Sequence, residues 1–132
     1  MLDIDDFKEV NDKFGHAFGD LALQNFGNLQ QASVRSSDKV VRWGGEEFLI
    51  YLSNIDEVEV CRIAENVRAM VENTSVADEQ HSANITVSIG IAYSHEADEL
   101  KAVIKLADKR LYTAKRKDKN CVVDWGFVKP TT

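Results

Sequence analysis

The chain has 132 residues, of which 44% are hydrophobic and 29% are charged, a composition typical of one ordinary globular domain. Its net charge of -6 argues against a nucleic-acid-binding protein, which would need a basic face. No apolar run approaches the ~20 residues that cross a bilayer, and the beginning lacks a signal-peptide pattern. We therefore expect a cytoplasmic protein without a membrane partner. Cys61 and Cys121 are far apart in apolar contexts, which favours reduced thiols.

Hydrophobic periodicity predicts strands that alternate with helices. Apolar and acidic residues alternate at 2–5, whereas 56–73 and 98–117 carry apolar stripes at helical spacing. The predicted elements, in chain order, are a strand at 2–5, helices at 7–14 and 19–33, strands at 40–43 and 48–52, a helix at 56–73, a strand at 85–93, a helix at 98–117 and a strand at 121–125. This order predicts one α/β (α+β) domain over 1–125, a sandwich with a mixed central sheet, followed by a polar tail at 126–132.

The pair Gly44-Gly45 lies between two β-type runs and is the clearest local signal in the sequence. Adjacent glycines accept positive φ at little cost, so they favour a tight hairpin. Glu46 and Glu47 follow at once, and a second acidic cluster, Asp3 with its neighbours, ends the first strand. Carboxylates and backbone carbonyls hold hard divalent cations such as Mg²⁺. Spacing alone leaves two readings open, a metal site or polar strand ends that face water.

Seven short motifs follow one another along the chain: Asp3-Ile4-Asp5-Asp6-Phe7-Lys8, Asn11-Asp12, Gly15-His16, Gly19-Asp20, Arg42-Trp43-Gly44-Gly45-Glu46-Glu47-Phe48, Val87-Ser88-Ile89-Gly90, and Ala107-Asp108 with Leu111-Tyr112 and Ala114-Lys115. In order and spacing these seven blocks resemble the GGDEF family, the domain of diguanylate cyclases. A lone Gly-Gly-Glu-Glu-Phe would be weak support, whereas seven blocks in order from Leu2 to about Val123 are strong. Glu46 stands where the family more often has Asp, a variant that keeps a carboxylate.

The resemblance implies a palm-type sandwich, similar to nucleotide cyclases and ferredoxin-like folds. It also implies a bacterial second-messenger enzyme that condenses two GTP into cyclic di-GMP and two pyrophosphates with Mg²⁺ or Mn²⁺. Since each domain would bind one GTP, the working enzyme would be a homodimer or another homo-oligomer. The metal would be held by Asp3, the backbone carbonyl of Ile4, and Glu46.

The same resemblance implies three catalytic side chains. Glu46 would help to deprotonate the attacking ribose hydroxyl, and Glu47 would be a metal or positioning neighbour. Lys8 looks like the family lysine that stabilises charge beside the triphosphate. Without the motif, Lys8 would be interpreted as a solvated helix lysine.

Guanine recognition would fall to Asn11 and Asp20, because an amide can bond the base edge and a carboxylate can accept from its N1 and N2 donors. Outside the motif, Asn11 is an ordinary turn residue and Asp20 an ordinary residue of a helix start. His16 lies between them and would border the pocket, in a structural more than a catalytic role.

Two lysines near the end of the last helix complete the predicted substrate site. Lys115 matches the family lysine that reaches the terminal phosphates. Lys119 stands where arginine is usual, and Asp118 where glycine is common. Lysine keeps the charge but loses the bidentate fork of arginine, so we expect a weaker hold on phosphate.

Arg35 and Asp38 match the Arg-x-x-Asp inhibitory site that lies just before the hairpin in many relatives. By resemblance, Arg35 would contact the guanines and phosphates of cyclic di-GMP, and Asp38 would accept from guanine. The alternative is a pair of charges that flank a turn. Asn66 occupies the place of a supporting arginine found in some relatives.

Family members have a helix and an Asp-x-Leu-Thr turn before the strand with the metal aspartate, whereas here Leu2 already begins that strand. We therefore expect Met1 in the middle of the sheet and an apolar surface beside it, which favours oligomerisation. Two alternatives to a cyclase stay open, an inactive module that binds cyclic di-GMP or GTP, and a fragment without a role.

Overall fold

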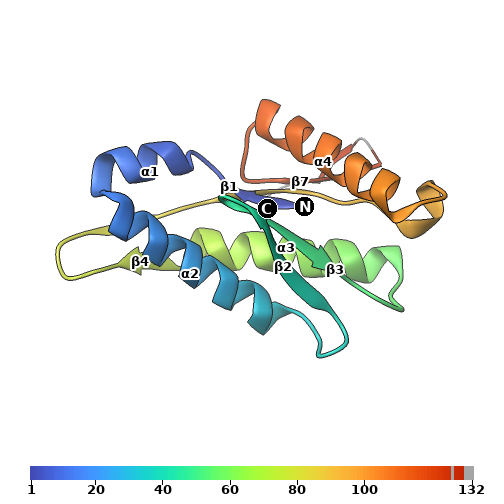
Figure 1. Cartoon of the computed structure of the whole chain (residues 1–132), viewed down its shortest axis with the longest axis horizontal. Coiled ribbons are helices and arrows are strands. Elements are labelled where there is room, and N and C mark those ends of the chain that lie inside the picture. Colours follow the sequence, from blue (N-terminus) through green and yellow to red (C-terminus); the bar gives the residue numbers. More distant parts are fainter. Residues whose placement is uncertain (126, 130–132) are drawn as a thin grey trace.

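A computed structural model of the chain describes residues 1–125 and 127–129 (Figure 1). In chain order the elements are β1 (Leu2–Ile4), α1 (Phe7–Phe14), α2 (His16–Ser33), β2 (Lys39–Gly44), β3 (Glu47–Tyr51), α3 (Glu57–Asn73), β4 (Ser75–Ala77), β5 (Ser82–Asn84), β6 (Val87–Gly90), the short 3-10 helix η1 (Ser94–Glu96), α4 (Leu100–Arg116), β7 (Val122–Asp124) and β8 (Phe127–Lys129). Within this described part, no helix is both long enough and apolar enough to cross a membrane.

The main sheet has the strand order β2-β3-β1-β6-β7-β8. The short strand β1 pairs antiparallel with both β3 and β6, so it lies in the interior of the sheet. The pairing of β6 with β7 is parallel, whereas that of β7 with β8 is antiparallel. The sheet is therefore mixed, and both this prediction and the central position of β1 are confirmed.

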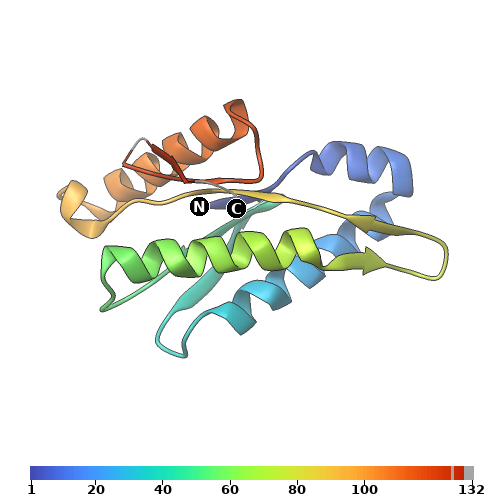
Figure 2. The same ribbon diagram turned by 180° about the vertical axis from the view of Figure 1, so that it is seen from behind.

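Helices cover both faces of this sheet, as Figures 1 and 2 show from opposite sides. On one face, Leu2 and Val87 pack with Phe26 of α2 and Val67 of α3 in the larger core cluster. On the other face, α4 contributes to a smaller cluster around Met1. The predicted α/β sandwich is thus the observed architecture.

Gly90 allows α4 to approach β6 very closely. A Cβ atom at this position would lie 2.2 Å from the backbone oxygen of Ala107 and 2.3 Å from the backbone nitrogen of Leu111. Such contacts are with backbone and cannot be relieved by turning a side chain. The helix that carries Lys115 is thereby fixed against the strand beside β1.

Three predicted boundaries differ from the structure. The second helix begins at His16 and not at 19–20, since only Gly15, with φ of 93°, separates it from α1. The strand predicted at 85–93 is shorter, Val87–Gly90, because the chain then turns into η1, where the Tyr93 N–H donates to Glu96. The tail predicted at 126–132 is partly wrong, because residues 127–129 form β8; residues 126 and 130–132 lie outside the described residues.

The hairpin of β4 and β5 was not predicted from the sequence. Asp78 accepts hydrogen bonds from the N–H groups of Gln80 and His81, which closes the turn between the two strands. The His81 ring lies against Phe14 and Phe18, with centroid distances of 5.3 and 6.2 Å. The hairpin therefore packs on the corner between α1 and α2.

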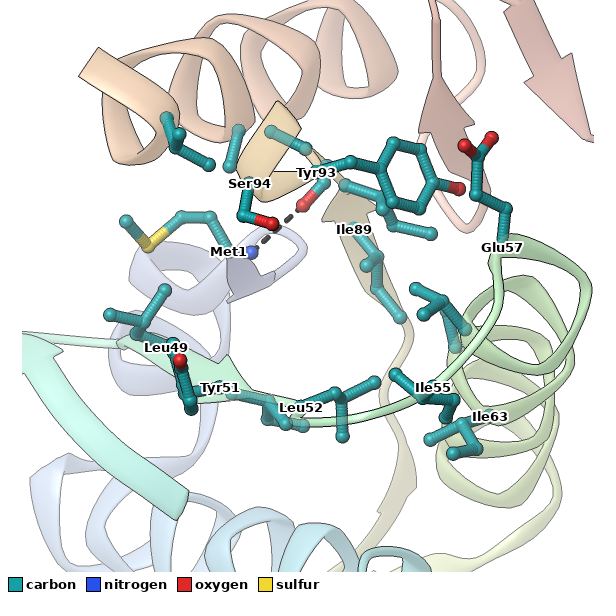
Figure 3. A pocket seen from close by; sticks show the side chains of 18 of the residues that line it. Met1, Leu49, Tyr51, Leu52, Ile55, Glu57, Ile63, Ile89, Tyr93 and Ser94 are labelled. Carbon is teal, nitrogen blue, oxygen red and sulfur yellow. Dashed lines mark hydrogen bonds between the residues drawn. The ribbon is translucent and has the colours of Figure 1, made fainter. Parts of the chain in front are cut away.

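An apolar pocket of about 710 Å³ opens beside Met1, between β3, β6, α3 and α4 (Figure 3). The buried α-amino group of Met1 lies in it and donates to the carbonyl of Gly90 at 2.8 Å. Leu49 and Leu52 lie on one side and Ile89 on another (Figure 3).

Candidate active site

The end of β1 brings acidic and cationic groups together. After Ile4 the chain leaves the sheet, and Asp6, with φ of 55°, turns it into α1. This turn sets Asp5 inside the molecule, where it is 4% exposed, and leaves Asp6 at the surface. A buried carboxylate requires several hydrogen bonds to offset its lost hydration.

Asp5 receives four of them. Its Oδ1 accepts from Ser88 Oγ at 2.6 Å and from Lys115 Nζ at 2.9 Å. Its Oδ2 accepts from Thr86 Oγ1 at 2.7 Å and from the backbone N–H of Asn120 at 2.9 Å. Desolvation alone would raise its pKa, but these hydrogen bonds outweigh it and the pKa is lowered. One carboxylate thereby ties β1 to β6, α4 and the turn after α4.

The ammonium group of Lys115 lies at the end of β1. Besides Asp5, it contacts the backbone oxygens of Ile4 at 3.0 Å and Asp3 at 3.4 Å. It is also 3.5 Å from Oδ1 of Asp3, an ion pair without hydrogen-bond geometry. The structure therefore brings Lys115 onto the same atoms that the sequence analysis assigned to a metal ion.

The hairpin delivers its two glutamates next to Asp3. In the register of β1 and β3, Glu47 is the residue directly opposite Asp3, while Glu46 lies in the preceding turn. Arg42 braces this turn, because its Nε and Nη2 donate to the carbonyl of Gly45 at 2.9 and 2.7 Å. Like charges opposed on neighbouring strands repel one another, so this arrangement favours a bound cation.

The electrostatics reflect this crowding. Desolvation raises the pKa of Asp3 to about 6, opposed by Lys115 and reinforced by the charges of Glu46 and Glu47. The pKa of Glu47 is also raised, first by desolvation and then by the charges of Asp108 and Glu46. Both shifts have the sign expected where several acids share a small volume.

The oxygen groups at the end of β1 fit a hard divalent cation. Oδ1 of Asp3 is buried without a hydrogen-bond partner, and the carbonyl of Ile4 points to the same ammonium group. Across residues 1–125 and 127–129, no three His, Cys, Asp or Glu side chains form a ready-made metal site. An ion here would therefore use carboxylates, a backbone carbonyl and oxygens of the substrate.

The predicted guanine residues lie at the corner of α1 and α2. Asn11 is half-buried on α1, whereas His16 and Asp20 are exposed on the first turns of α2. Gly19 permits the two helices to meet there, because a Cβ at Gly19 would lie 1.8 Å from Oδ1 of Asn11. Lys8 lies on the exposed side of α1.

The second predicted phosphate residue, Lys119, is paired with an acid of the β1–α1 turn. Its Nζ donates to Oδ1 of Asp6, and both side chains are partly exposed. Lys119 and Asn120 have φ values of 57° and 46°, so the turn adopts the left-handed region there and not at Asp118.

Arg35 and Asp38 contact one another directly. Nε and Nη2 of Arg35 donate to Oδ2 and Oδ1 of Asp38 at 3.0 and 2.8 Å. The backbone N–H groups of Arg35 and Ser53 donate to the same carboxylate. Since Asp38 is buried and both its oxygens are engaged, a ligand at this place would first meet the half-exposed guanidinium of Arg35.

Comparison with known proteins identifies the family. Residues 1–121 match the family model described as diguanylate cyclase, GGDEF domain. The chain belongs to the GGDEF family. The fold and the recognition made from the seven sequence blocks are thereby confirmed.

Among curated GGDEF proteins, diguanylate cyclase A of Treponema denticola is 37% identical over 123 residues, which is 92% of this chain and 33% of that protein. The chain spans about a third or less of the length of this relative and of diguanylate cyclase DosC of Escherichia coli. The GGEEF domain of a diguanylate cyclase from Vibrio cholerae, described as active, is 30% identical with a TM-score of 0.84, covering 94% of this chain and 79% of that one.

A GGDEF domain solved with cyclic di-GMP has the same fold. It belongs to DgcB of Caulobacter crescentus, is 29% identical with a TM-score of 0.88, and the match covers 93% of this chain and 74% of that one. This likeness and that to the Vibrio cholerae domain show that the chain has the fold of known GGDEF domains.

Sequence analysis did not assign a role to Asp5 or Gly19 in this GGDEF domain. A signal for Asp5 was present, because Thr86 and Ser88 are hydroxyl residues within an otherwise apolar strand. Polar residues on a buried strand imply a buried partner. Gly19 gave no such signal, since its role appears only when Asn11 is packed against it.

The close approach at Gly19 makes Gly19→Ala a selective test of Asn11. The new methyl group would displace the amide of Asn11 and would press on the ring of Phe7 at 3.3 Å, and both are side chains that can shift. We therefore expect the fold to persist and GTP to bind about tenfold more weakly, the loss of roughly one hydrogen bond. Calorimetric titration with a non-hydrolysable GTP analogue measures this change. The matched control is Gly27→Ala, whose Cβ would meet Phe48 at an ordinary 3.8 Å.

The Arg35–Asp38 pair predicts a pH-dependent contribution to stability. Hydrogen bonds from Arg35 lower the pKa of Asp38 to about 2, below the unfolded value of about 3.9. The contribution is therefore full above pH ~4 and is lost as the pH falls from ~4 to ~2. We expect Asp38→Asn to lower the free energy of unfolding by about 2 kcal/mol at pH 7. Urea titrations at several pH values should show this difference shrink below pH 4; a difference independent of pH would contradict it.

Proposed function

We propose that this chain condenses two GTP molecules into cyclic di-GMP and releases two pyrophosphates. The observation that carries the proposal is the convergence of Asp3, the Glu46–Glu47 turn and Lys115 at the end of β1. Acidic groups for a metal and a cation for phosphates thus share one site. The relatives named as diguanylate cyclases support the same reaction.

The proposed metal is Mg²⁺ or Mn²⁺, held by Asp3, the carbonyl of Ile4, and Glu46. When bound, such an ion offsets negative charge on the phosphates of the substrate. The half-buried Glu46 would accept the proton of the ribose 3′-hydroxyl of one GTP while O3′ attacks the α-phosphorus of the other GTP. The new bond joins O3′ to that phosphorus, and the bond to the bridging oxygen of pyrophosphate breaks.

Cations and polar groups of the chain would orient the nucleotide. Lys115, Lys119 and Lys8 are the proposed partners of the phosphates, which requires Lys115 and Lys119 to exchange their present carboxylates for phosphate oxygens. Asn11 and Asp20 would read the guanine edge, with His16 at the border of the pocket. Each side chain here binds or orients, which lowers the entropic part of the barrier.

A reaction between two GTP molecules requires two of these sites to meet, so the proposed working form is a homodimer. The rate per chain should then rise with chain concentration until dimers are complete. Because the substrate is GTP, the proposed location is the cytoplasm. Arg35 is the proposed contact for the product cyclic di-GMP, with Asp38 as its neighbour.

The proposal is tested by incubating the purified chain with GTP and Mg²⁺ at a series of chain concentrations. We expect cyclic di-GMP, formed at a rate that rises more than linearly with chain concentration. Binding of GTP or cyclic di-GMP by calorimetry without turnover at any concentration would favour the alternative, an inactive binding module.

A further inference from the structure

We infer that Lys115, held by Asp5, occupies the cation position at the end of β1 until a nucleotide arrives, so that the site takes up a divalent metal only together with its nucleotide. The inference rests on the metal site of the proposed function and adds a specificity determinant to it. In this role Lys115 excludes a free metal ion before it contacts any phosphate.

The first step is the geometry of the ammonium group. Nζ of Lys115 lies 3.0 Å from the carbonyl of Ile4 and 3.5 Å from Oδ1 of Asp3. These two oxygens belong to the proposed ligand set of the metal. A divalent ion that binds a carbonyl and a carboxylate at about 2.1 Å would stand beside the ammonium group, and the two positive charges would repel strongly. Lys115 and a free metal ion therefore compete.

The second step is that Lys115 is firmly held. The side chain of Asp5 is 2% exposed and that of Lys115 is 24% exposed, so their ion pair is not a solvated surface pair of negligible strength. The backbone next to Lys115 is also fixed, because Ala114 is fully buried and α4 lies against Gly90. A metal ion alone therefore has to displace a partly buried ion pair.

The third step explains how a nucleotide releases the lysine. When Lys115 turns to a phosphate, Asp5 keeps its hydrogen bonds from Ser88, Thr86 and the N–H of Asn120. The departure of the lysine therefore does not leave a buried carboxylate without partners, which would be costly. The phosphates supply the negative charge that draws Lys115 away and complete the coordination of the incoming ion. Asp5 is thus a positioning residue that works in both states.

The test is a calorimetric titration of the whole chain with Mn²⁺ in the absence of nucleotide. Lys115→Met removes the competing charge and keeps the length of the side chain. A neighbouring charge at this distance changes the ionisation equilibrium of a group by about one to three powers of ten. Because Lys115 and Mn²⁺ are both positive, we expect Lys115→Met to bind Mn²⁺ at least about tenfold more tightly than the wild type does. The same variant should bind a GTP analogue more weakly, so metal and nucleotide affinities change in opposite directions.

Three controls make the result specific. Lys101→Met changes an exposed lysine in the first turn of α4 and should leave Mn²⁺ binding as in the wild type. Adding Asp3→Asn to Lys115→Met should remove the gain, which assigns the ion to the end of β1. Lys115→Gln removes the charge while keeping a donor toward Asp5, and it replaces Lys115→Met if that variant lacks the wild-type circular dichroism spectrum.

Equal Mn²⁺ affinity in the wild type and the folded Lys115 variant would overturn the inference, as would a gain that survives Asp3→Asn. Neither readout depends on turnover. A tighter, Asp3-dependent Mn²⁺ site in a chain that never converts GTP would sustain the inference and reject the cyclase. If the wild type converts GTP but binds Mn²⁺ as tightly as Lys115→Gln does, the cyclase proposal stands and the inference about Lys115 is rejected.

Discussion

Glu46→Gln is expected to reduce formation of cyclic di-GMP to below about one-thousandth of the wild-type rate while the domain stays folded. Glutamine has the size of glutamate but cannot accept the proton of the 3′-hydroxyl or supply a charged metal ligand. The residue lies in a turn whose shape is fixed by Gly45 and Arg42, so the backbone does not depend on the carboxylate. The measurement is initial turnover of GTP with Mg²⁺, followed by chromatography.

The control for Glu46→Gln is Glu79→Gln, a change of the same chemistry on the exposed β4–β5 turn, and it should leave turnover unaltered. Of the two turns, the one between β2 and β3 lies next to Asp3, so Glu46→Gln and Glu79→Gln should differ sharply in turnover. Turnover that persists after Glu46→Gln in a folded chain would remove Glu46 from both roles proposed for it.

The second large effect is expected for Gly90→Ala. Its methyl group would lie 2.2 Å from the backbone oxygen of Ala107, so α4 and β6 must separate. Overpacking of this kind costs about 3 kcal/mol or more in the free energy of unfolding, which for a domain of this size lowers Tm by about 10 °C. The shift of α4 also moves Lys115 away from Asp3, so GTP binding should weaken beyond the loss of stability.

Gly27→Ala serves as the control, because this glycine lies inside α2 and has room for a methyl group. Removing a helix-interior glycine should stabilise the domain by up to about 1 kcal/mol. Thermal unfolding followed by circular dichroism gives both values. An unchanged Tm for Gly90→Ala would mean that α4 does not approach β6 as closely as the structure has it.

Much of the fold was predictable because its signals are local. The glycine pair between two β-type runs predicted the β2–β3 hairpin, and apolar stripes predicted α3 and α4 close to their observed ends. The β4–β5 hairpin was missed because its sequence is polar, and its place depends on the packing of His81 against the aromatic corner of α1 and α2. Tertiary contacts, and not periodicity, hold that segment.

The sequence named the residues of the candidate site but not the contacts between them. The motif blocks pointed to Asp3, Glu46 and Lys115, and the structure brings Lys115 to Asp3 and β3 beside β1. The sequence did not reveal that Lys115 lies on the proposed metal ligands, because that contact joins residues more than a hundred positions apart. Nor did it reveal that Asp38 is fully engaged by its own neighbours.

The most direct test of the central claim is the product balance of GTP turnover by the purified wild-type chain with Mg²⁺ at a concentration where dimers form. The account predicts one cyclic di-GMP and two pyrophosphates for every two GTP consumed, with Glu46→Gln inactive under the same conditions. GTP that binds with calorimetric heat yet is recovered unchanged, at every chain concentration and with either Mg²⁺ or Mn²⁺, would contradict the claim that this site is a cyclase.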